Sequence, residues 1–368
     1  MSILALETSC DDTCAAVVDA DGTIRANVIS SQIAHEEFGG VVPEIASRHH
    51  LEIVNAIVER ALSDASIGIE QVELVAATQG PGLVGALLVG LSTAKALAAA
   101  RELPFAPVDH LQGHVAANFL RDGGATGTGD GAADRADDGA DEDASLPVSF
   151  EPPFICLVAS GGHTLLVQVH EHDGFEVLGR TLDDAAGEAF DKGARMLGLG
   201  YPGGAALERL ARGGDPDAFA FPGSRSERAK GGRGSQREAF ARSLDFSFAG
   251  LKTALLYKLR ELPAEQAEAQ AADLAASYQA AIVDSLLDRV VRALEQSGSQ
   301  RLAVGGGVAA NGALRERLGE LGVTLRVPAR VLCTDNAAMI ASAARYSKQL
   351  AYPDYLGLDA YATGERAH

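Results

Sequence analysis

Two histidines four residues apart could share one metal ion. His110 and His114 lie in the segment VDHLQGHVAANF, which reads as the first turns of a helix. Side chains at positions i and i+4 of a helix point the same way, so both imidazoles can reach one ion. A zinc protease of the HExxH type needs a glutamate base between its histidines, and Leu111, Gln112 and Gly113 stand there instead. The protease is therefore excluded, while metal binding and a plain surface or core location both stay open.

A possible third ligand lies far along the chain, in CTDNAAMIA (333–341), at the start of a predicted helix. Thr334, Asp335 and Asn336 can each cap that helix, and capping is the usual role of these residue types at such a place. If a neighbour does the capping, Asp335 can join the two histidines. Two histidines and one carboxylate with open positions are typical of iron(II) sites and are also tolerable for zinc.

Two glycine-rich turns predict a site for an anion or a flat ligand. SGGHT (160–164) joins two apolar strands, and its backbone N–H groups and hydroxyls can form an anion nest. Adjacent glycines also suit an ordinary hairpin turn, and that alternative stays open. GGGVAAN (305–311) ends a strand and opens a helix, where missing side chains and the helix N-terminus favour phosphates.

A pair of carboxylates lies in EAFDKGARMLG (188–198), where Glu188 and Asp191 are one helical turn apart. Carboxylates so placed can accept hydrogen bonds from ribose hydroxyls. They can also pair with Lys192 and Arg195, and the spacing alone favours this second interpretation.

The elements that would position these residues occur in two similar halves. ILALETSCDDTCAAVV (3–18) and FICLVASGGHTLLVQV (154–169) are both apolar strand pairs around a polar turn, and aligning Ser9 with Ser160 places Thr13 on Thr164. Hydrophobic periodicity predicts the remaining elements. The first half has strands over 23–29, 72–78 and 105–110 and helices over 44–65, from 80 and from 110. The second has strands over 175–181, 301–306 and 323–327 and helices over 183–197, up to 296, from 311 and from 336.

Each half thus reads β-β-β-α-β-α-β-α, which predicts an α/β protein of two lobes, each a mixed sheet flanked by helices, with a ligand cleft between them. This arrangement resembles the actin, sugar kinase and Hsp70 superfamily. We expect the first lobe over residues 1–121, an acidic insertion over 122–150, the second lobe over 151–350 and a tail over 351–368.

Composition fits a soluble protein. The 368 residues are 47% hydrophobic, enough for two cores, and no run approaches the roughly 18 to 20 apolar residues that span a bilayer. The start of the chain lacks the features of a signal peptide. Cys10, Cys14, Cys156 and Cys333 form no CxxC pair, so we expect neither a disulfide framework nor a zinc ribbon, no membrane partner, and a cytoplasmic location.

Charge is unevenly distributed along the chain. The net charge of −19 argues against a nucleic-acid partner, but residues 122–145 hold eight acidic residues and one arginine, and without their −7 the rest carries −12. We expect that segment to be disordered. Residues 224–243 hold six basic residues and two acidic ones, which suits an RNA-binding arm or a plain solvated loop.

Several longer motifs, in order along the chain, resemble the bacterial tRNA N6-adenosine threonylcarbamoyltransferase family. They are ETSCDDT, GGVVPEIASRHHLE, GPGLVGALLVG, HLQGHVAANF, ASGGHTLLV, TLDDAAGEAFDKGARMLGLGYPGG, FSFAGLKTA, GGVAANGALR and CTDNAAMIA. The resemblance implies transfer of threonylcarbamoyl from threonylcarbamoyl-AMP to the adenosine beside the anticodon of tRNAs that read codons beginning with A. It also implies one divalent metal per chain, with iron(II) favoured over zinc, and as partners a paralogous subunit of the same fold and a small P-loop ATPase.

The resemblance implies roles for particular residues. His110, His114 and Asp335 match the family's metal ligands, and Asp11 in ETSCDDT is expected to be catalytic or positioning. The positions expected to bind substrate are Val158, Ala159, Ser160, Gly161, Gly162, Asp191, Gly204 and Asn311. Residues 224–243 become the candidate tRNA contact.

The sequence departs from the family pattern at two points, and two other functions remain as alternatives. Archaeal relatives add a tyrosine ligand, yet no tyrosine follows His114 until Tyr201, and an acidic insertion after the histidine helix is unusual. A kinase or ATPase of the same superfamily is one rival, but its magnesium carboxylates are missing from SGGHT. A non-catalytic paralogue is the other, and it would be expected to lack the metal ligands that this chain keeps.

Overall fold

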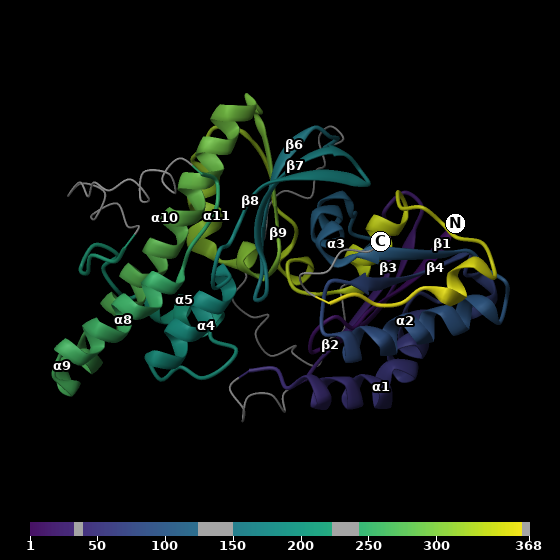
Figure 1. Ribbon diagram of the computed structural model, residues 1–368, viewed down its shortest axis with the longest axis horizontal. Coiled ribbons are helices and arrows are strands. Elements are labelled where there is room, and N and C mark those ends of the chain that lie inside the picture. The colour runs from purple at the N-terminus through teal and green to yellow at the C-terminus, as the bar shows by residue number, and fades with distance from the viewer. Residues whose placement is uncertain (33–39, 124–149, 223–242, 363–368) are drawn as a thin grey trace.

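The computed structural model describes residues 1–32, 40–123, 150–222 and 243–362, which form two lobes lying side by side (Figure 1). The acidic insertion and the basic segment 224–243 lie almost entirely outside the described residues. Both interpretations of these segments therefore stay predictions.

The first lobe is built on a five-stranded mixed sheet in the order β3-β2-β1-β4-β5. β1 pairs antiparallel with β2 and parallel with β4. The strands are β1 (Ser2–Glu7), β2 (Asp12–Asp19), β3 (Ile24–Ser31), β4 (Leu74–Gly80) and β5 (Phe105–Asp109).

The second lobe repeats this sheet. Its order is β8-β7-β6-β9-β10, with β6 antiparallel to β7 and parallel to β9, so each strand has the same place as its counterpart in the first sheet. The predicted duplication is confirmed. The strands are β6 (Phe154–Ala159), β7 (Thr164–Glu171), β8 (Gly174–Arg180), β9 (Arg301–Gly305) and β10 (Thr324–Arg326).

The aligned threonines occupy equivalent places. The hydroxyl of Thr13 lies 2.7 Å from Nδ1 of His50, which is on the helix that follows β3. The hydroxyl of Thr164 accepts a hydrogen bond of 2.8 Å from the backbone N–H of Ala186, at the start of the helix in the second half. In both lobes the threonine ties the end of the hairpin to a helix.

Side chains alternate between the two faces of the first sheet, as the pleat requires. Leu4 and Leu6 pack with α1 (Pro43–Asp64) and α2 (Val84–Ala99). Ile3 and Ala5 pack on the opposite face with α12 (Ala337–Ala344). These two apolar layers form the core of the first lobe.

The second sheet also has two covered faces. Ile155 and Leu157 pack in the large core formed with the helices of this lobe, which Figure 1 shows on its outer side. These helices are α4 (Ala186–Met196), α5 (Gly204–Ala211), α8 (Ala249–Glu261), α9 (Ala264–Ala269), α10 (Ala271–Ser297) and α11 (Gly312–Gly319). Short 3₁₀ turns are η2 (Ile69–Gln71), η3 (Ala117–Phe119), η5 (Gly307–Ala310), η6 (Arg330–Leu332) and η7 (Asp354–Gly357).

The final helix of each half packs across the lobe boundary. Val115 of α3 (His110–Ala116) joins Phe154, Cys156 and Val158 on the inner face of the second sheet. Conversely, α12 from the second half covers the inner face of the first sheet. The helix from 336 was expected in the second lobe, over 151–350, but α12 lies on the first lobe because its alanines pack against the first sheet.

Residues after α12 also lie on the first lobe. Leu350 exchanges two backbone hydrogen bonds with Phe105 of β5, of 2.8 and 2.9 Å, and the N–H of Tyr361 donates to the carbonyl of Gln79. The numerical boundaries expected for the lobes stay a prediction, but spatially the chain returns to its first sheet before residue 350.

Most predicted element boundaries agree with the structure to within a few residues. The helix α4 was expected from residue 183 and begins at Ala186. Asp183 instead accepts hydrogen bonds from the backbone N–H groups of Phe248 and Ala249, and so caps α8. All four cysteines are free thiols. Among the described helices, none is both long enough and apolar enough to cross a membrane.

Candidate functional site

The helix α3 buries both histidines between the lobes. Its first N–H groups, those of Leu111 and Gln112, donate to the Asp109 carboxylate at 2.8 and 3.1 Å, so the helix begins at His110. Only 4% of His110 and none of His114 is exposed. The surface location left open for this pair is therefore wrong.

A glycine lets α12 approach α3 between the two histidines. A Cβ at Gly113 would lie 2.8 Å from Cδ1 of Ile340, closer than two carbon atoms can pack. At the start of α12, Asn336 takes the capping role, with its side-chain oxygen accepting from the N–H of Met339 at 2.9 Å. The neighbouring Asp335 carboxylate is left to face the histidines.

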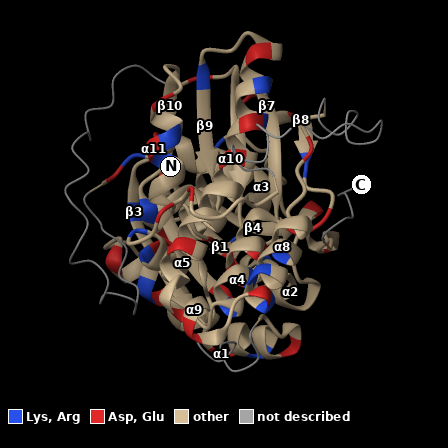
Figure 2. Ribbon diagram, turned by 90° about the vertical axis from the view of Figure 1, so that its left-hand side faces the viewer, with Lys and Arg blue, Asp and Glu red and all other residues tan. Residues whose placement is uncertain are grey.

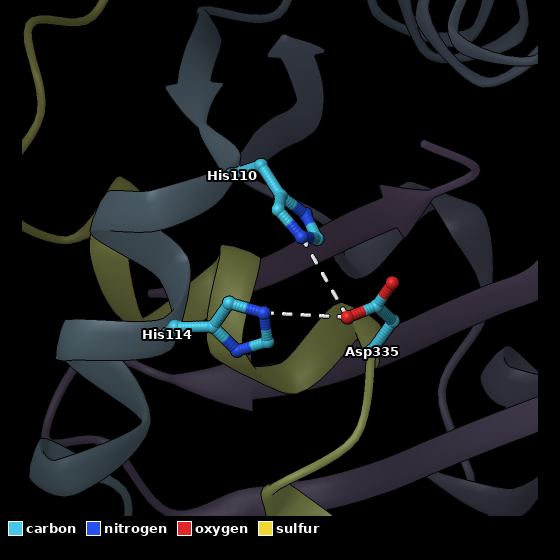
Figure 3. A group of neighbouring side chains, drawn as sticks. All are labelled: His110, His114 and Asp335. Carbon is cyan, nitrogen blue, oxygen red and sulfur yellow. Dashed lines mark ion pairs between the residues drawn. The ribbon is translucent and has the colours of Figure 1, made fainter. Parts of the chain in front are cut away.

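The three predicted ligands converge, as Figure 3 shows. One carboxylate oxygen of Asp335 lies 3.3 Å from Nε2 of His114 and 3.6 Å from Nε2 of His110. The ligand atoms of all three residues lie within 4.8 Å of one another. This is the one group of three or more such side chains that meets this condition among the described residues.

The polar atoms around the cluster fit a cation. Among the described residues, neither ring nitrogen of His114 has a hydrogen-bond partner, although its Nε2 lies beside Asp335. A buried imidazole without partners is costly, and a metal ion accepting its lone pair would remove that cost. Nδ1 of His110 is oriented by Glu7 at 3.1 Å and Ser9 at 3.2 Å, which leaves Nε2 directed toward Asp335.

Charges in the cluster reinforce one another. Burial alone would lower the pKa of His110, but the carboxylates of Asp335 and Glu7 raise this pKa to about 9. Burial would raise the pKa of Asp335, but His110 and His114 hold it below its usual value. The two carboxylates therefore favour a positive charge between them, and a divalent cation bound there would take the place of the proton on His110.

A pocket of about 570 Å³ opens beside this cluster. Both lobes line it, so the predicted cleft is present. Seven of the predicted site residues line it: Asp11, His110, Ser160, Gly161, Gly162, Asp191 and Asp335.

The other five predicted site residues do not line the pocket. Val158 and Ala159 are buried in β6. The N–H of Gly204 donates to the Asp191 carboxylate at 3.2 Å, and Asn311 caps α11 while its amide donates to Gln279 at 2.9 Å. His114 is wholly buried beneath the pocket.

The SGGHT turn exposes its backbone to the pocket. A Cβ at Gly161 or Gly162 would meet nothing within 4 Å, and neither residue has a left-handed φ. The hairpin itself therefore does not require glycine at these positions. The absence of side chains instead leaves the backbone open to a ligand.

The carboxylates of α4 differ in their contacts. Glu188 pairs with Lys192 at 2.6 Å, as the ion-pair interpretation expected. Asp191 instead accepts from the N–H groups of Gly203 and Gly204, and its pKa is raised by burial. Arg195 lines the pocket near it and supplies positive charge there.

Three residues near the metal cluster had no role assigned from the sequence. Glu7 and Ser9 hold His110, and His163 lines the pocket with its ring centre 6.3 Å from that of His110. Burial, followed by the nearby His110 and His114, lowers the pKa of His163 to about 4. An acidic residue at the end of an apolar strand was the available signal for Glu7.

The fold and the cluster define a class of protein: a two-lobed α/β protein of actin-like fold with a candidate metal site at its cleft. Two solved structures share the fold at 14% identity. Component A of (R)-2-hydroxyglutaryl-CoA dehydratase from Acidaminococcus fermentans has a TM-score of 0.51 over 94% of this chain and 97% of that one. Full-length HypF has a TM-score of 0.52 over 94% of this chain and 55% of that one.

Sequence similarity gives the particular family. Residues 23–127 and 142–342 match the TsaD family, tRNA N6-adenosine threonylcarbamoyltransferase. A relative of that name from Symbiobacterium thermophilum is 48% identical, covering 94% of this chain and 91% of its own length. A relative of the same name from Trichlorobacter lovleyi is 45% identical, covering 99% of this chain and 96% of its own length. The chain belongs to the tRNA N6-adenosine threonylcarbamoyltransferase family.

Proposed function

We propose that this chain transfers the threonylcarbamoyl group of threonylcarbamoyl-AMP to the N6 amine of the adenosine beside the anticodon, in tRNAs that read codons beginning with A. The observation that carries the proposal is the buried cluster of His110, His114 and Asp335 at the pocket between the lobes. Membership of a transferase family supplies the reaction type.

The donor is already activated, so the protein has chiefly to align two reactants. The adenosine amine attacks the carbonyl carbon of the mixed anhydride, a C–N bond forms, and the C–O bond to the phosphate breaks with AMP leaving. The amine gives up a proton, and Asp11 at the pocket wall is our candidate to receive it. Alignment of the two reactants in the pocket supplies much of the rate enhancement.

The pocket residues divide between the two ends of the donor. The open backbone of the turn from Ser160 to Gly162 suits the phosphate. The start of α4 holds this turn, because the N–H of Gly187 donates to the carbonyl of Ser160 at 3.1 Å. Asp191 and Arg195 lie on the same wall and suit the nucleoside and an anionic group. Val158, Ala159, Gly204 and Asn311 would act through the backbone and helix ends that they form.

The threonylcarbamoyl end would lie against the metal cluster. His110, His114 and Asp335 would hold one divalent ion, iron(II) in preference to zinc, and when bound it would supply Lewis acidity to the carbonyl. Glu7 and Ser9 fix the ring of His110 so that its Nε2 lies toward that position. Partial exposure of Asp335 keeps one side of the site open to substrate.

From the family resemblance we further propose two protein partners, a paralogous subunit of the same fold and a small P-loop ATPase. Because the substrate is tRNA, we place the transfer reaction in the cytoplasm. Residues 224–243 stay the sequence-based candidate for a tRNA contact.

The test is nucleoside mass spectrometry after incubation with threonylcarbamoyl-AMP, unmodified tRNA and the two partners. We expect threonylcarbamoyladenosine with the wild type and at least a hundredfold less with His110→Ala. His170→Ala is the control, because His170 pairs with Glu176 on the exposed surface. Absence of product from the wild type, together with ATP hydrolysis that His110→Ala leaves unchanged, would support the ATPase or kinase instead.

A further inference from the structure

A second pocket lies between the lobes, away from the metal cluster. Its volume is about 770 Å³, and it shares no lining residue with the first pocket. β2 begins at Asp12, next to Asp11 of the first pocket, and ends at Asp19, just before Asp21 of the second. Seven steps of about 3.3 Å put the two pockets about 23 Å apart along this strand.

Arginines from four separate segments line this second pocket: Arg121, Arg301, Arg326 and Arg345. Its lining carboxylates are Asp21 and Glu151, so the formal charge of the lining is positive in a chain of net charge −19. Glu151 is also engaged by Nε2 of His172 at 2.8 Å. Figure 2 shows Lys and Arg interspersed with Asp and Glu over the ribbon, including one basic position on β9.

Two of the guanidinium groups are held side by side by consecutive carbonyls. Nε of Arg326 donates to the carbonyl of Asn118 at 3.2 Å. Nη2 of Arg345 donates to the carbonyl of Phe119 at 3.1 Å and to the hydroxyl of Ser342 at 3.0 Å. Because η3 directly follows the histidine helix, one segment positions the two histidines and the carbonyls that hold these arginines.

Arg326 and Arg345 are partly buried and lack close counterions in the described part of the chain. Within the described ranges neither Arg326 nor Arg345 forms an ion pair, whereas Arg121 lies 4.0 Å from the Asp21 carboxylate. Burial lowers the pKa of both guanidinium groups. At Arg345, Tyr346 and the Asp21 carboxylate oppose this lowering of the pKa, and the positive charge of Arg121 adds to it. An anion in the pocket would replace the lost hydration of these groups.

Aromatic rings make the pocket wall rigid. The rings of His172 and Tyr346 are stacked at 4.2 Å, and Phe119 packs against His172 at 4.9 Å. The guanidinium of Arg345 lies over Tyr346 at 5.0 Å. Planar guanidinium groups fixed in this way can bind phosphate oxygens in pairs, and arginine with aromatic rings is typical of RNA-binding surfaces.

We propose that this pocket binds backbone phosphates of the tRNA substrate, at a distance from the adenosine that reacts. The proposal rests on the proposed function. RNA fits better than a single small anion because its phosphates recur along the strand, so arginines on several segments can each meet one. It gives the acidic chain a tRNA contact within the described residues, independent of residues 224–243.

The test measures tRNA binding by the full chain at several salt concentrations. Arg121→Gln/Arg326→Gln should weaken binding about tenfold or more at low salt and reduce the slope of log K against log salt by about 1 to 2. In transfer assays with the partners, the KM for tRNA should rise while kcat at saturating tRNA stays unchanged. Arg60→Gln is the matched control, because Arg60 pairs with Asp64 on the outside of α1.

Two further results separate a binding role from a structural one. Arg326→Lys keeps the positive charge, so it should bind tRNA with most of the wild-type affinity. Arg121→Gln alone alters a half-exposed side chain and should still raise the KM for tRNA. Unchanged affinity, salt slope and KM in the double variant would overturn the proposal. Failure of the wild type to modify tRNA from threonylcarbamoyl-AMP would instead contradict the proposed function, so the two failures can be told apart.

Discussion

At the scale of single residues, Glu7 links the first strand to the metal cluster. Its carboxylate is buried, accepts from the hydroxyl of Thr78, and lies 3.1 Å from Nδ1 of His110. A carboxylate in this place fixes the histidine tautomer and makes the other ring nitrogen a better ligand. Burial alone would not orient the imidazole ring of His110.

Glu7→Gln should therefore weaken metal binding about 10- to 100-fold, because the ring of His110 loses its charged partner. Titration with a chelator of known affinity measures this effect without relying on activity. Glu73→Gln removes the same charge from an exposed residue that pairs with the chain's N-terminus, and it should leave the metal affinity unchanged. Equal affinities for the Glu7 variant and the wild type would remove Glu7 from the site.

At the scale of elements, the start of α12 decides where Asp335 points. Asn336 is wholly buried, and it both caps the helix and donates to the carbonyl of Thr334 at 2.8 Å. The amide thereby fixes the turn that carries the carboxylate. Capping and metal binding are divided between two adjacent residues.

Asn336→Ala should lower the free energy of unfolding by about 1 to 2 kcal/mol and also weaken metal binding. Urea denaturation and metal titration measure the two effects. Asn311→Ala removes the equivalent cap of α11, where Asn311 accepts from the N–H of Leu314 at 3.0 Å, and should lower stability alone. Loss of stability in Asn336→Ala with unchanged metal affinity would show that Asp335 is positioned by other contacts.

Much at this scale could be predicted from the sequence. The period of the apolar residues and the paired hairpins predicted both sheets and their duplication, because local patterns reflect local burial. The location of α12 on the first lobe could not be predicted in this way. Its apolar composition requires a buried face but does not specify which sheet covers it.

The candidate site shows the same division. The spacing of His110 and His114 predicted a shared direction, and a spare carboxylate near residue 335 was foreseen. The second pocket was not foreseen, since its arginines come from four separate segments and no local pattern relates Arg121 to Arg345. The sequence instead predicted the tRNA contact in a continuous basic stretch, residues 224–243.

At the scale of the whole molecule, the two lobes exchange their last helices. α3 covers the second sheet and α12 covers the first, so the metal ligands lie where these helices meet. Gly305 of β9 permits this contact, because a Cβ there would lie 2.5 Å from the carbonyl of His114. A bound ion would therefore join both halves of the duplicated chain at the pocket.

The measurement that tests the central claim most directly is a metal add-back titration of the transfer rate. Chelator-stripped protein receives increasing iron(II) or zinc, with threonylcarbamoyl-AMP, tRNA and the partner proteins in excess. We predict a rate near zero in the stripped protein, a linear rise that ends at one equivalent per chain, and no rise for Asp335→Ala. A stripped protein that transfers at the full rate, or an Asp335→Ala variant that responds like the wild type, would contradict a metal-dependent transferase at this cleft.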